Sequence, residues 1–365
     1  MLRRHRLEPL LAAALAIGLF GTGTPHPVAT LALCTLWGLS PLWTWWVSRP
    51  HRRRRGQALA AADTAYLHGV ARDTWRYFER CITPQDLHLP PDNLQIAPHD
   101  MLARRTSPTN IGLYLLSVAC ARQFGWIGTM ELLSRLEATL ASVATLQRHR
   151  GHLLNWYDTA TGAPLLPMYV YTVDSGNFCG HLLALAQACE ALADAPFDDR
   201  ASQRALAASL ARLAPLLAAR HQLSPEQRDE LRAALADHRA TRRSAALDTQ
   251  AHASDATQRL QALARSCQQL AVQADFSFLY HRKRHLFHIG YRVAEQELDA
   301  GFYDLLASES RLTSLFAVAK GDVPVRHWAS LGRPFFAVGA DAGLRSWSGS
   351  MFEYLMPTLV LTEPQ

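Results

Sequence analysis

The feature that most constrains the fold is a long stretch without charged residues near the amino terminus. Between Glu8 and Arg49 the chain contains no Asp, Glu, Lys or Arg. Residues 7–24 and 27–47 form two mostly apolar runs, separated by the turn-rich sequence Gly21-Thr-Gly-Thr-Pro-His-Pro27. An apolar segment of about 20 residues is long enough to cross a bilayer as a helix. The pattern therefore predicts a hairpin of two transmembrane helices within residues 1–50, in contact with the membrane through residues 7–47.

Arginines flank the outer ends of both runs and are absent from their connection. They are Arg3, Arg4 and Arg6 on one side and Arg49, Arg52, Arg53, Arg54 and Arg55 on the other. The positive-inside preference then predicts a multi-pass protein with both ends of the hairpin and the remaining chain in the cytoplasm. An alternative is a secretory signal, with MLRRHR as its basic region and LLAAALAIGLF as its apolar region. The second apolar run and the following arginines would then stop the transfer.

The basic character of the chain is confined to this region. The whole chain has a net charge of +6, and eight arginines against Glu8 give +7 up to position 55, so the rest carries −1. A nearly neutral remainder argues against a nucleic-acid partner. The six cysteines are scattered without a CxxC pair, so neither a disulfide framework nor a zinc site is indicated.

Beyond residue 58 the apolar periodicity is mostly that of amphipathic helices. It predicts helices over residues 61–80, 109–124, 128–148 and 175–193, with Thr109 or Asn110 capping the second and Asp174 or Ser175 capping the fourth. Residues 151–173 are expected to form a long loop. Further helices are expected within 201–272 and over 305–320, 325–331 and 350–361, and a small β-hairpin or loop element over 276–304.

This order of elements predicts an all-α fold, an α/α toroid or another helical bundle. The expected divisions are residues 1–50 for the transmembrane helices and 51–108 for a juxtamembrane linker and first helix. A helical domain follows over 109–272, with an Ala-rich helical insertion at 195–272, and a catalytic region begins at 273–365. No GxGxxG, P-loop, GxSxG or HExxH motif is present, so nucleotide, serine-hydrolase and zinc-protease chemistry lack their minimum parts.

Four loops combine carboxylates with aromatic or amide neighbours, a mixture that suits sugars because their hydroxyls need polar partners and their C–H faces pack on rings. Each loop taken alone is also explained by the preference of Asp and Asn for turns. The candidate substrate-binding residues are Asp92 in the first loop, Asn155, Trp156 and Asp158 in the second, Asp174 and Asn177 in the third, and Trp347, Glu353 and Tyr354 in the fourth.

Glu309 is the candidate catalytic residue, because apolar neighbours and Arg311 suggest that it lies on a helix running into a partly buried setting. Cleavage of a glycosidic bond uses two carboxyl groups across that bond. The alternative is a helix-surface or capping glutamate. A metal site at His281, His285 and His288 is disfavoured, because Arg282, Lys283 and Arg284 place three positive charges between them. No metal is expected.

At these motifs the sequence resembles the central region of cyclic β-1,2-glucan synthases. The matching stretches are SPLWTWWVSRP, LPPDNLQ, RTSPTNIGLYLLS, FGWIGTMELLSRLEATL, RGHLLNWYDT, TVDSGN, GHLLALAQAC, HLFHIGY, DLLASESRLTSLFAVAKGDVPVRHW and WSGSMFEYLMP. The resemblance implies a bacterial inner-membrane protein with an incomplete, glucoamylase-like (α/α)6 toroid. The expected partners are β-1,2-glucan and the missing synthase domains, a glycosyltransferase and a phosphorylase-like part. UDP-glucose would serve that transferase, and no cofactor is expected in this region.

The activity implied by the resemblance is retaining transglycosylation, which closes linear β-1,2-glucan into a ring, or hydrolysis of the same glucan. By its motif Glu309 would be the nucleophile, and the acid/base carboxylate is expected beyond residue 365, so the chain alone could lack activity. The family pattern tends to have Asp where His281 stands and Asn where Arg292 stands. The alternatives are a non-catalytic glucan-binding or scaffolding module of a membrane synthase, and a regulatory protein acting through the Ala-rich helices.

Overall fold

The structure is a computed structural model that describes residues 7–47, 59–338 and 341–361. The chain divides into two compact units, residues 1–68 and residues 69–365. The predicted domain boundaries stay predictions, and each unit is described by itself below.

The first unit contains a helical hairpin. It is built from α1 (Glu8–Gly21) and α2 (Pro27–Gly38), which pack against each other, and α3 (Ser40–Val47) follows directly. Gly38 of α2 faces Ala12 of α1, where an added Cβ would make an ordinary van der Waals contact at 3.6 Å with the Ala12 Cβ. The Ser40 hydroxyl donates a 2.6 Å hydrogen bond to the Glu8 carboxylate. Helices α1 and α2 therefore form a helical hairpin.

The expectation that these helices cross a membrane is not supported. Within the described residues, no helix is both long enough and apolar enough to span a bilayer. The two helices have 14 and 12 residues, which at 1.5 Å per residue falls well short of the roughly 30 Å hydrocarbon layer. The second apolar run is broken at Leu39, between α2 and α3. The flanking arginines, Arg3 to Arg6 and Arg49 to Arg55, lie outside the described residues.

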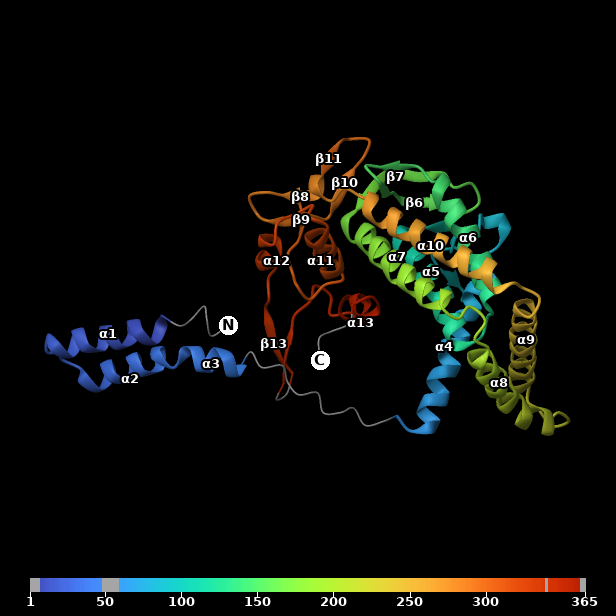
Figure 1. Ribbon diagram of the computed structural model, residues 1–365, viewed down its shortest axis with the longest axis horizontal. Helices are drawn as coiled ribbons and strands as arrows, with labels where there is room; N and C mark the ends of the chain where they lie inside the picture. The colour runs from blue at the N-terminus through green and yellow to red at the C-terminus, as the bar shows by residue number, and fades with distance from the viewer. Residues whose placement is uncertain (1–6, 48–58, 339–340, 362–365) are drawn as a thin grey trace. The chain divides into compact units, whose positions relative to one another are not determined.

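The second unit is mainly helical, as predicted (Figure 1). Its helices are α4 (Ala61–Cys81, which starts before the division), α5 (Pro108–Phe124), α6 (Thr129–Thr145), α7 (Thr172–Ala193), α8 (Arg200–Ala218), α9 (Pro225–Asp248), α10 (Ala253–Gln273), α11 (Ser310–Lys320), α12 (Arg326–Ser330) and α13 (Met351–Leu355). The predicted ranges for α4 to α7 are confirmed to within a few residues. The helix expected over 305–320 begins later, at Ser310.

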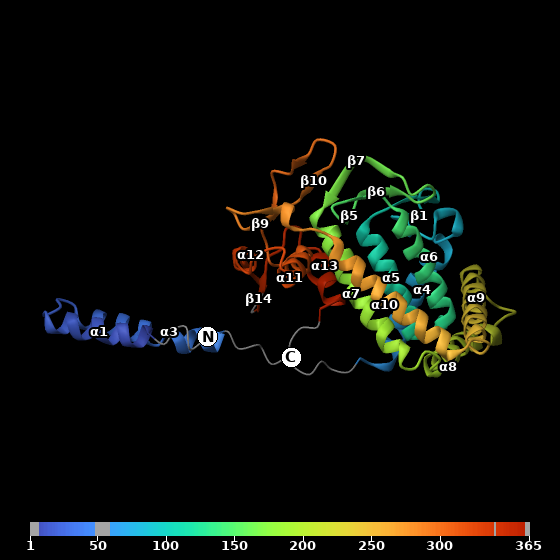
Figure 2. The same cartoon turned by 45° about the horizontal axis from the view of Figure 1, so that its top comes forward.

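Helix α7 is the centre of this unit, because α5, α10 and α11 all pack against it. Its buried residues belong to one continuous hydrophobic core that also includes Trp75 of α4, Tyr114 of α5 and Phe276. Figure 1 and Figure 2 show α5, α7 and α10 side by side, with β6 and β7 at one end of them. That end is where the candidate site lies.

The expectation of a long loop over 151–173 is wrong. Most of this segment forms strands β5 (His152–Leu153), β6 (Asn155–Asp158) and β7 (Pro164–Tyr171). Antiparallel pairing gives a five-stranded sheet in the order β11 (Glu297–Leu298), β10 (Gly290–Arg292), β7, β6 and β3 (Arg105–Thr106). Gly290 is required at its position, because an added Cβ would lie 2.3 Å from the Tyr169 ring on β7. The fold is thus mostly helical with a sheet at one end, rather than all-α.

The remaining strands form small antiparallel sheets. The β-element predicted near 276–304 is confirmed by β8 (Tyr280–His281), β9 (Leu286–His288) and β12 (Phe302–Tyr303), which pair in the order β12, β9, β8. The other pairs are β1 (Leu94–Gln95) with β2 (Met101–Leu102), β4 (Arg148–His149) with β5, and β13 (Phe335–Val338) with β14 (Asp341–Leu344). Short 3₁₀ turns lie at Pro84–Asp86, Ser277–Leu279 and Met356–Leu359.

The ends of two helices differ from their predicted caps. Helix α5 is capped by Ser107, whose hydroxyl accepts a hydrogen bond from the Asn110 amide, and it ends at Gly125 in the left-handed region (φ 80°). The prediction of Thr109 or Asn110 as the cap is therefore wrong by two or three residues. Helix α7 begins with Tyr171 at its N-cap position and has no side-chain cap. Asp174 and Ser175 lie inside its first turn, so the prediction that one of them caps the helix is wrong. The Asp174 carboxyl group instead acts on Glu309, as described below.

Candidate functional site

Glu309 lies directly before α11, and two glycines of α7 bring it close to that helix. A Cβ on Gly176 would lie 1.9 Å from Thr313 Oγ1, and one on Gly180 would lie 2.8 Å from a methyl carbon of Leu312. Because both positions lack side chains, the first turn of α11 packs tightly against the first turns of α7. Glu309 therefore lies beside residues that follow the start of α7.

Asn177 connects three of the surrounding elements. Its side-chain amide donates to Glu309 Oε2 at 3.4 Å and to Thr109 Oγ1 of α5 at 3.2 Å. Asn177 is fully buried, and its amide oxygen has no hydrogen-bond partner among the described residues. A buried polar atom without a partner costs free energy. The oxygen is therefore a natural acceptor for a hydroxyl group that enters the site.

The electrostatic setting of Glu309 favours its neutral form. Burial, followed by the nearby charges of Asp174 and Glu353, raises the pKa of Glu309 to about 7, against the opposing hydrogen bond from Asn177. A helix N-terminus normally favours a carboxylate, so burial outweighs that effect here. Within the described residues Glu309 forms no ion pair.

Asp174 is the closest charge partner of Glu309 in this setting. Burial raises the pKa of Asp174, and polar groups of Thr109, Asn155 and Ser107 oppose that shift. Tyr303 of β12 is also part of the cluster, since burial and then the charges of Glu309 and Asp174 raise its pKa. Two carboxyl groups and a phenol thus share one poorly solvated volume.

Glu353 has a different role from Glu309. It forms a capping box with Ser350 at the start of α13, and its carboxylate accepts hydrogen bonds from the Ser346 hydroxyl at 3.0 Å and the Ser348 hydroxyl at 2.5 Å. Burial opposes ionisation of Glu353, but the hydrogen bonds from Ser348, Ser350 and Ser346 lower its pKa to about 2. The carboxylate therefore fixes the loop that carries Trp347.

That loop presents an aromatic surface. Trp347 is 50% exposed, its ring lies 6.0 Å from that of Tyr303, and its indole N–H donates to Asp304 at 3.1 Å. Tyr354 holds the loop in place, because its hydroxyl accepts a hydrogen bond from the Ser346 amide at 3.0 Å and donates one to the carbonyl of Leu344 at 2.7 Å. An exposed indole ring next to buried carboxyl groups is a suitable platform for the C–H face of a sugar.

The other predicted binding residues lie in two places, near the cluster of Glu309, Asp174, Asn177 and Tyr303 and at the edge of the five-stranded sheet. Asn155 is buried, belongs to the surroundings of Asp174, and has no hydrogen-bond partner of ordinary geometry within the described residues. Asp158 accepts hydrogen bonds from Ala160 and Thr161 in a turn. Neither Asp158 nor Trp156 nor Asp92 hydrogen-bonds to Glu309 or Asp174 among the residues described.

Trp156 and Asp92 share a partner on β3. The Arg105 guanidinium lies 5.0 Å from the Trp156 ring and donates to the Asp92 carboxylate at 2.9 Å. The structure therefore brings together Glu309, Asp174, Asn177, Asn155, Glu353 and the Trp347 loop. It leaves Asp92, Trp156 and Asp158 at the sheet edge.

Sequence reasoning missed Thr109 and Tyr303 as members of the cluster. Tyr303 stands in a short strand whose pairing with Phe287 joins distant parts of the sequence, and nothing local marks it. Thr109 was considered as a helix cap, a role that Ser107 fills instead.

The histidines between residues 281 and 288 are occupied within their own hairpin. His285 Nδ1 lies 2.8 Å from the Tyr280 hydroxyl, and His288 Nδ1 lies 2.6 Å from the carbonyl of Asp299. In the part of the chain that the structure describes, no group of three His, Cys, Asp or Glu side chains is placed to hold a metal ion.

Comparison with known proteins identifies one long sequence match. No protein-family model matches the chain. The cyclic β-(1,2)-glucan synthase NdvB of Rhizobium meliloti (strain 1021) is 40% identical over 417 aligned residues, which cover 98% of this chain and 15% of that protein. The chain thus spans about 15% of the length of its relative. This match confirms the resemblance that the motifs indicate.

Two solved structures are similar at low sequence identity. A candidate glucoamylase from Bacteroides fragilis NCTC 9343 shares 13% identity with a TM-score of 0.49, over 83% of this chain and 60% of that one. An endo-β-1,2-glucanase from Chitinophaga pinensis, in complex with sophorotriose and glucose, shares 13% identity with a TM-score of 0.48, over 80% of this chain and 57% of that one.

Proposed function

Because the chain is homologous over nearly its whole length to a segment of a cyclic β-1,2-glucan synthase, we propose that it processes linear β-1,2-glucan by glycosidase-type chemistry at Glu309. The observation that carries the proposal is a half-buried glutamic acid whose pKa is raised to about 7, beside a second carboxyl group and an amide with an unused oxygen. A carboxyl group kept protonated near neutral pH is what a glycosidase needs to protonate the leaving oxygen.

We assign Glu309 the role of proton donor, in place of the nucleophile that its motif suggests. A nucleophile must be ionised, and burial together with the charge of Asp174 disfavours that form of Glu309. Asn177 holds the side chain through its 3.4 Å hydrogen bond. The unpaired amide oxygen of Asn177 would accept a sugar hydroxyl at the same point.

Transglycosylation is the reaction that we propose for this acid. Glu309 gives its proton to the oxygen of the glycosidic bond that breaks, the anomeric carbon forms its new bond to an acceptor hydroxyl in competition with water, and the proton of that hydroxyl returns to the Glu309 carboxylate. A bound acceptor raises the effective concentration of the hydroxyl. The half-exposed Trp347 ring beside Tyr303 supports this proposal, because it could hold an acceptor sugar next to the acid.

The test uses the purified chain and linear β-1,2-glucan, with products analysed by mass spectrometry. Cyclic products indicate transglycosylation and shortened linear products indicate hydrolysis. Replacing Glu309 by Gln keeps the shape and removes the proton, so turnover should fall by about 10²- to 10⁴-fold while glucan binding remains. Glu295→Gln, at an exposed position near β11, is the matched control and should keep full activity. A Glu309→Gln variant that turns over at the normal rate contradicts the assignment.

A non-catalytic glucan-binding module is the second candidate, and one observation favours it. The carboxyl groups whose charges act on Glu309 are Asp174 and Glu353. Burial holds Asp174 toward its neutral form, and the loop hydrogen bonds occupy the oxygens of Glu353. Neither group is therefore the ionised, accessible second carboxylate that cleavage of a glycosidic bond requires. Binding of the glucan by the wild-type chain without any product would support this second candidate.

A further inference from the structure

A groove of about 960 Å³ lies in the second unit between α4, α6 and α9. It shares no lining residue with the Glu309 cluster. Its volume is at the upper end of the roughly 300–1,000 Å³ typical of ligand pockets. The residues that matter for its chemistry are Arg72, Arg76 and Tyr77 of α4, Arg135 of α6, and Ala240 and Leu247 of α9.

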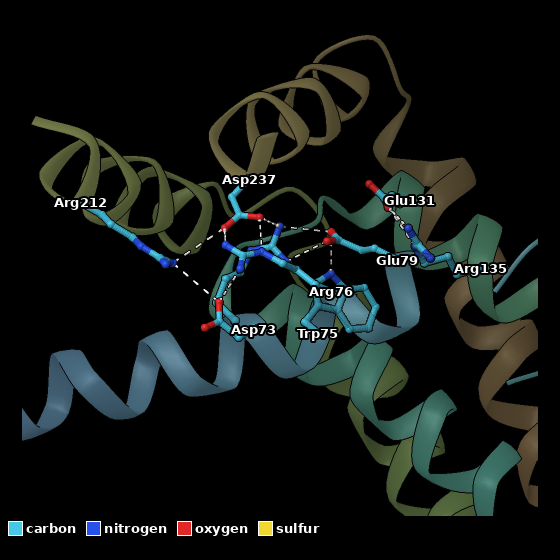
Figure 3. Close-up of polar contacts among 9 residues, drawn as sticks. Asp73, Trp75, Arg76, Glu79, Glu131, Arg135, Arg212 and Asp237 are labelled. Carbon is cyan, nitrogen blue, oxygen red and sulfur yellow. Dashed lines mark hydrogen bonds and ion pairs between the residues drawn. The ribbon is translucent and has the colours of Figure 1, made fainter. Parts of the chain in front are cut away.

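One wall of the groove is a fixed network of ion pairs (Figure 3). Asp237 of α9 accepts a hydrogen bond from Arg76 Nε at 2.9 Å and pairs with Arg72 at 3.1 Å. Arg72 also pairs with Glu79 at 2.9 Å, and the Trp75 indole donates to the same carboxylate at 2.9 Å. The groups hold one another in place, so the wall presents ordered donors and acceptors.

The charges of this wall are nearly balanced, which bears on the ligand. Five lining residues are arginines and four are carboxylates, for a net charge of +1. Arg72, Arg76 and Arg135 already pair with carboxylates. An anion that approached Arg72, Arg76 or Arg135 would have to compete with these pairs. A neutral ligand rich in hydroxyl groups could instead use the remaining lone pairs and N–H groups without disrupting the network.

The groove also has apolar lining residues. Ala236 and Ala240 of α9 are exposed along it, together with Ile96 at 72% and Leu247 at 47% exposure. The half-buried Tyr77 ring also lines the groove, with its hydroxyl directed to the carbonyl of Pro91. A ligand that contacts both the ion pairs and these apolar side chains needs a hydroxyl edge and a C–H face, as a pyranose sugar has.

We propose that this groove is a second, non-catalytic binding site for a neutral β-glucan chain. The inference rests on the proposed function, because it takes the same class of substrate. A second attachment point keeps the glucan at the protein while its end reacts at Glu309. It raises the local concentration of the reacting segment, as linked binding sites do.

The test is hydrogen–deuterium exchange of the full chain, in the Glu309→Gln background so that the ligand is not consumed. The probe is a short linear β-1,2-gluco-oligosaccharide, and a cello-oligosaccharide of equal length serves as the control ligand. We expect protection of residues 72–80 and 233–247 in addition to residues around 174–180 and 309. Ala240→Phe fills the groove from an exposed position. It should raise about tenfold the oligosaccharide concentration that gives half-maximal protection of residues 72–80 and 233–247. Ala246→Phe, exposed on α9 and not lining the groove, should leave it unchanged.

Two outcomes would overturn the inference and are distinct from failure of the proposed function. Protection confined to the Glu309 region means that the glucan binds at one site, so the second site is absent while the proposed function stands. Protection of α4 and α9 that persists undiminished in Ala240→Phe means that the groove does not hold the ligand. If the glucan protects neither region and the wild-type chain yields no products, the proposed function itself fails.

Discussion

Asp237 and Glu309 are both shielded carboxyl groups that lie beside α-helices, and their surroundings are opposite. Asp237 faces the guanidinium groups of Arg72 and Arg76, with Arg212 at 4.0 Å. Glu309 faces Asp174 and forms no ion pair within the described parts of the chain. The first arrangement pairs a carboxylate with cations, and the second raises the pKa of Glu309 to about 7.

The difference indicates which carboxyl group serves the structure and which serves chemistry. A carboxylate surrounded by arginines fastens α9 to α4, since neither α8 nor α9 contributes to the main hydrophobic core. A carboxyl group kept without a cation reduces stability, and such strained electrostatics concentrates at functional sites.

The largest expected effect on stability is that of Asp237→Ala. Removal of this carboxylate leaves Arg72 and the half-buried Arg76 without their shared partner, which should lower the free energy of unfolding by about 3–5 kcal/mol. Urea denaturation followed by circular dichroism measures it. Asp229→Ala removes an exposed pair with Arg232 and should change stability by less than about 1 kcal/mol. Equal effects of the two variants would contradict the structural role of Asp237.

Gly176→Ala tests how Glu309 is held in position. The added methyl group would overlap Thr313 Oγ1, so α11 must shift away from α7 at a stability loss of about 1–3 kcal/mol. Turnover should fall more than glucan binding, because the acid moves with α11. Gly69→Ala in α4 meets no atom within 4 Å and should stabilise the helix by up to about 1 kcal/mol. Normal turnover in Gly176→Ala would show that the tight crossing is not needed.

Glu309→Gln should make the protein more stable at alkaline pH. The pKa of Glu309 is about 7 in the folded chain against an ordinary value of 4.5, so the folded state binds more protons than the unfolded state between these values. Stability is therefore lost as pH rises through this window. The substitution removes the loss, so the free energy of unfolding at pH 8 should rise by about 1–2 kcal/mol after screening, with little change at pH 4. A gain of equal size at both pH values would exclude titration of Glu309 as the cause.

Asn177→Ala has the smallest expected effect, a shift in the pH dependence of turnover that reports on the surroundings of Glu309. The Asn177 amide lowers the pKa of Glu309 by donating a hydrogen bond to its carboxylate. Its removal should raise that pKa, and the alkaline limb of the pH–rate profile should move to higher pH. Asn93→Ala, whose amide bonds to Asp92 at 3.1 Å, is the control and should leave the profile in place. A shift to lower pH in Asn177→Ala would contradict the assigned hydrogen bond.

The helices were predictable from the sequence because their signals are local. Apolar spacing marks α4 to α7, and Ser224 followed by Pro225 marks the start of α9, where a capping box forms. Strand β7 was not predictable in this way. It contains Pro164 and Pro167, which usually argue against a strand within a sheet, and one of its partners, β10, lies more than a hundred residues further along the chain.

The candidate site was predictable in part for a similar reason. The pattern around Glu309 left a helix-surface glutamate open, and the family motif identified it. What the sequence could not provide is the set of neighbours that raises its pKa, since Asp174 and Tyr303 come from α7 and β12. Asp92 and Asp158 show the converse, because their turn motifs resemble binding loops and serve local hydrogen bonds.

The most direct test of the central claim is the pKa of Glu309 itself. Carbon-13 NMR of side-chain carboxyl groups in the wild-type chain, with the Glu309→Gln variant used to assign the resonance, follows this single group through a pH titration. We predict a midpoint near pH 7, well above those of the solvent-exposed glutamates. A midpoint at or below the ordinary glutamate value would show that Glu309 is ionised at neutral pH, and would contradict its role as the proton donor.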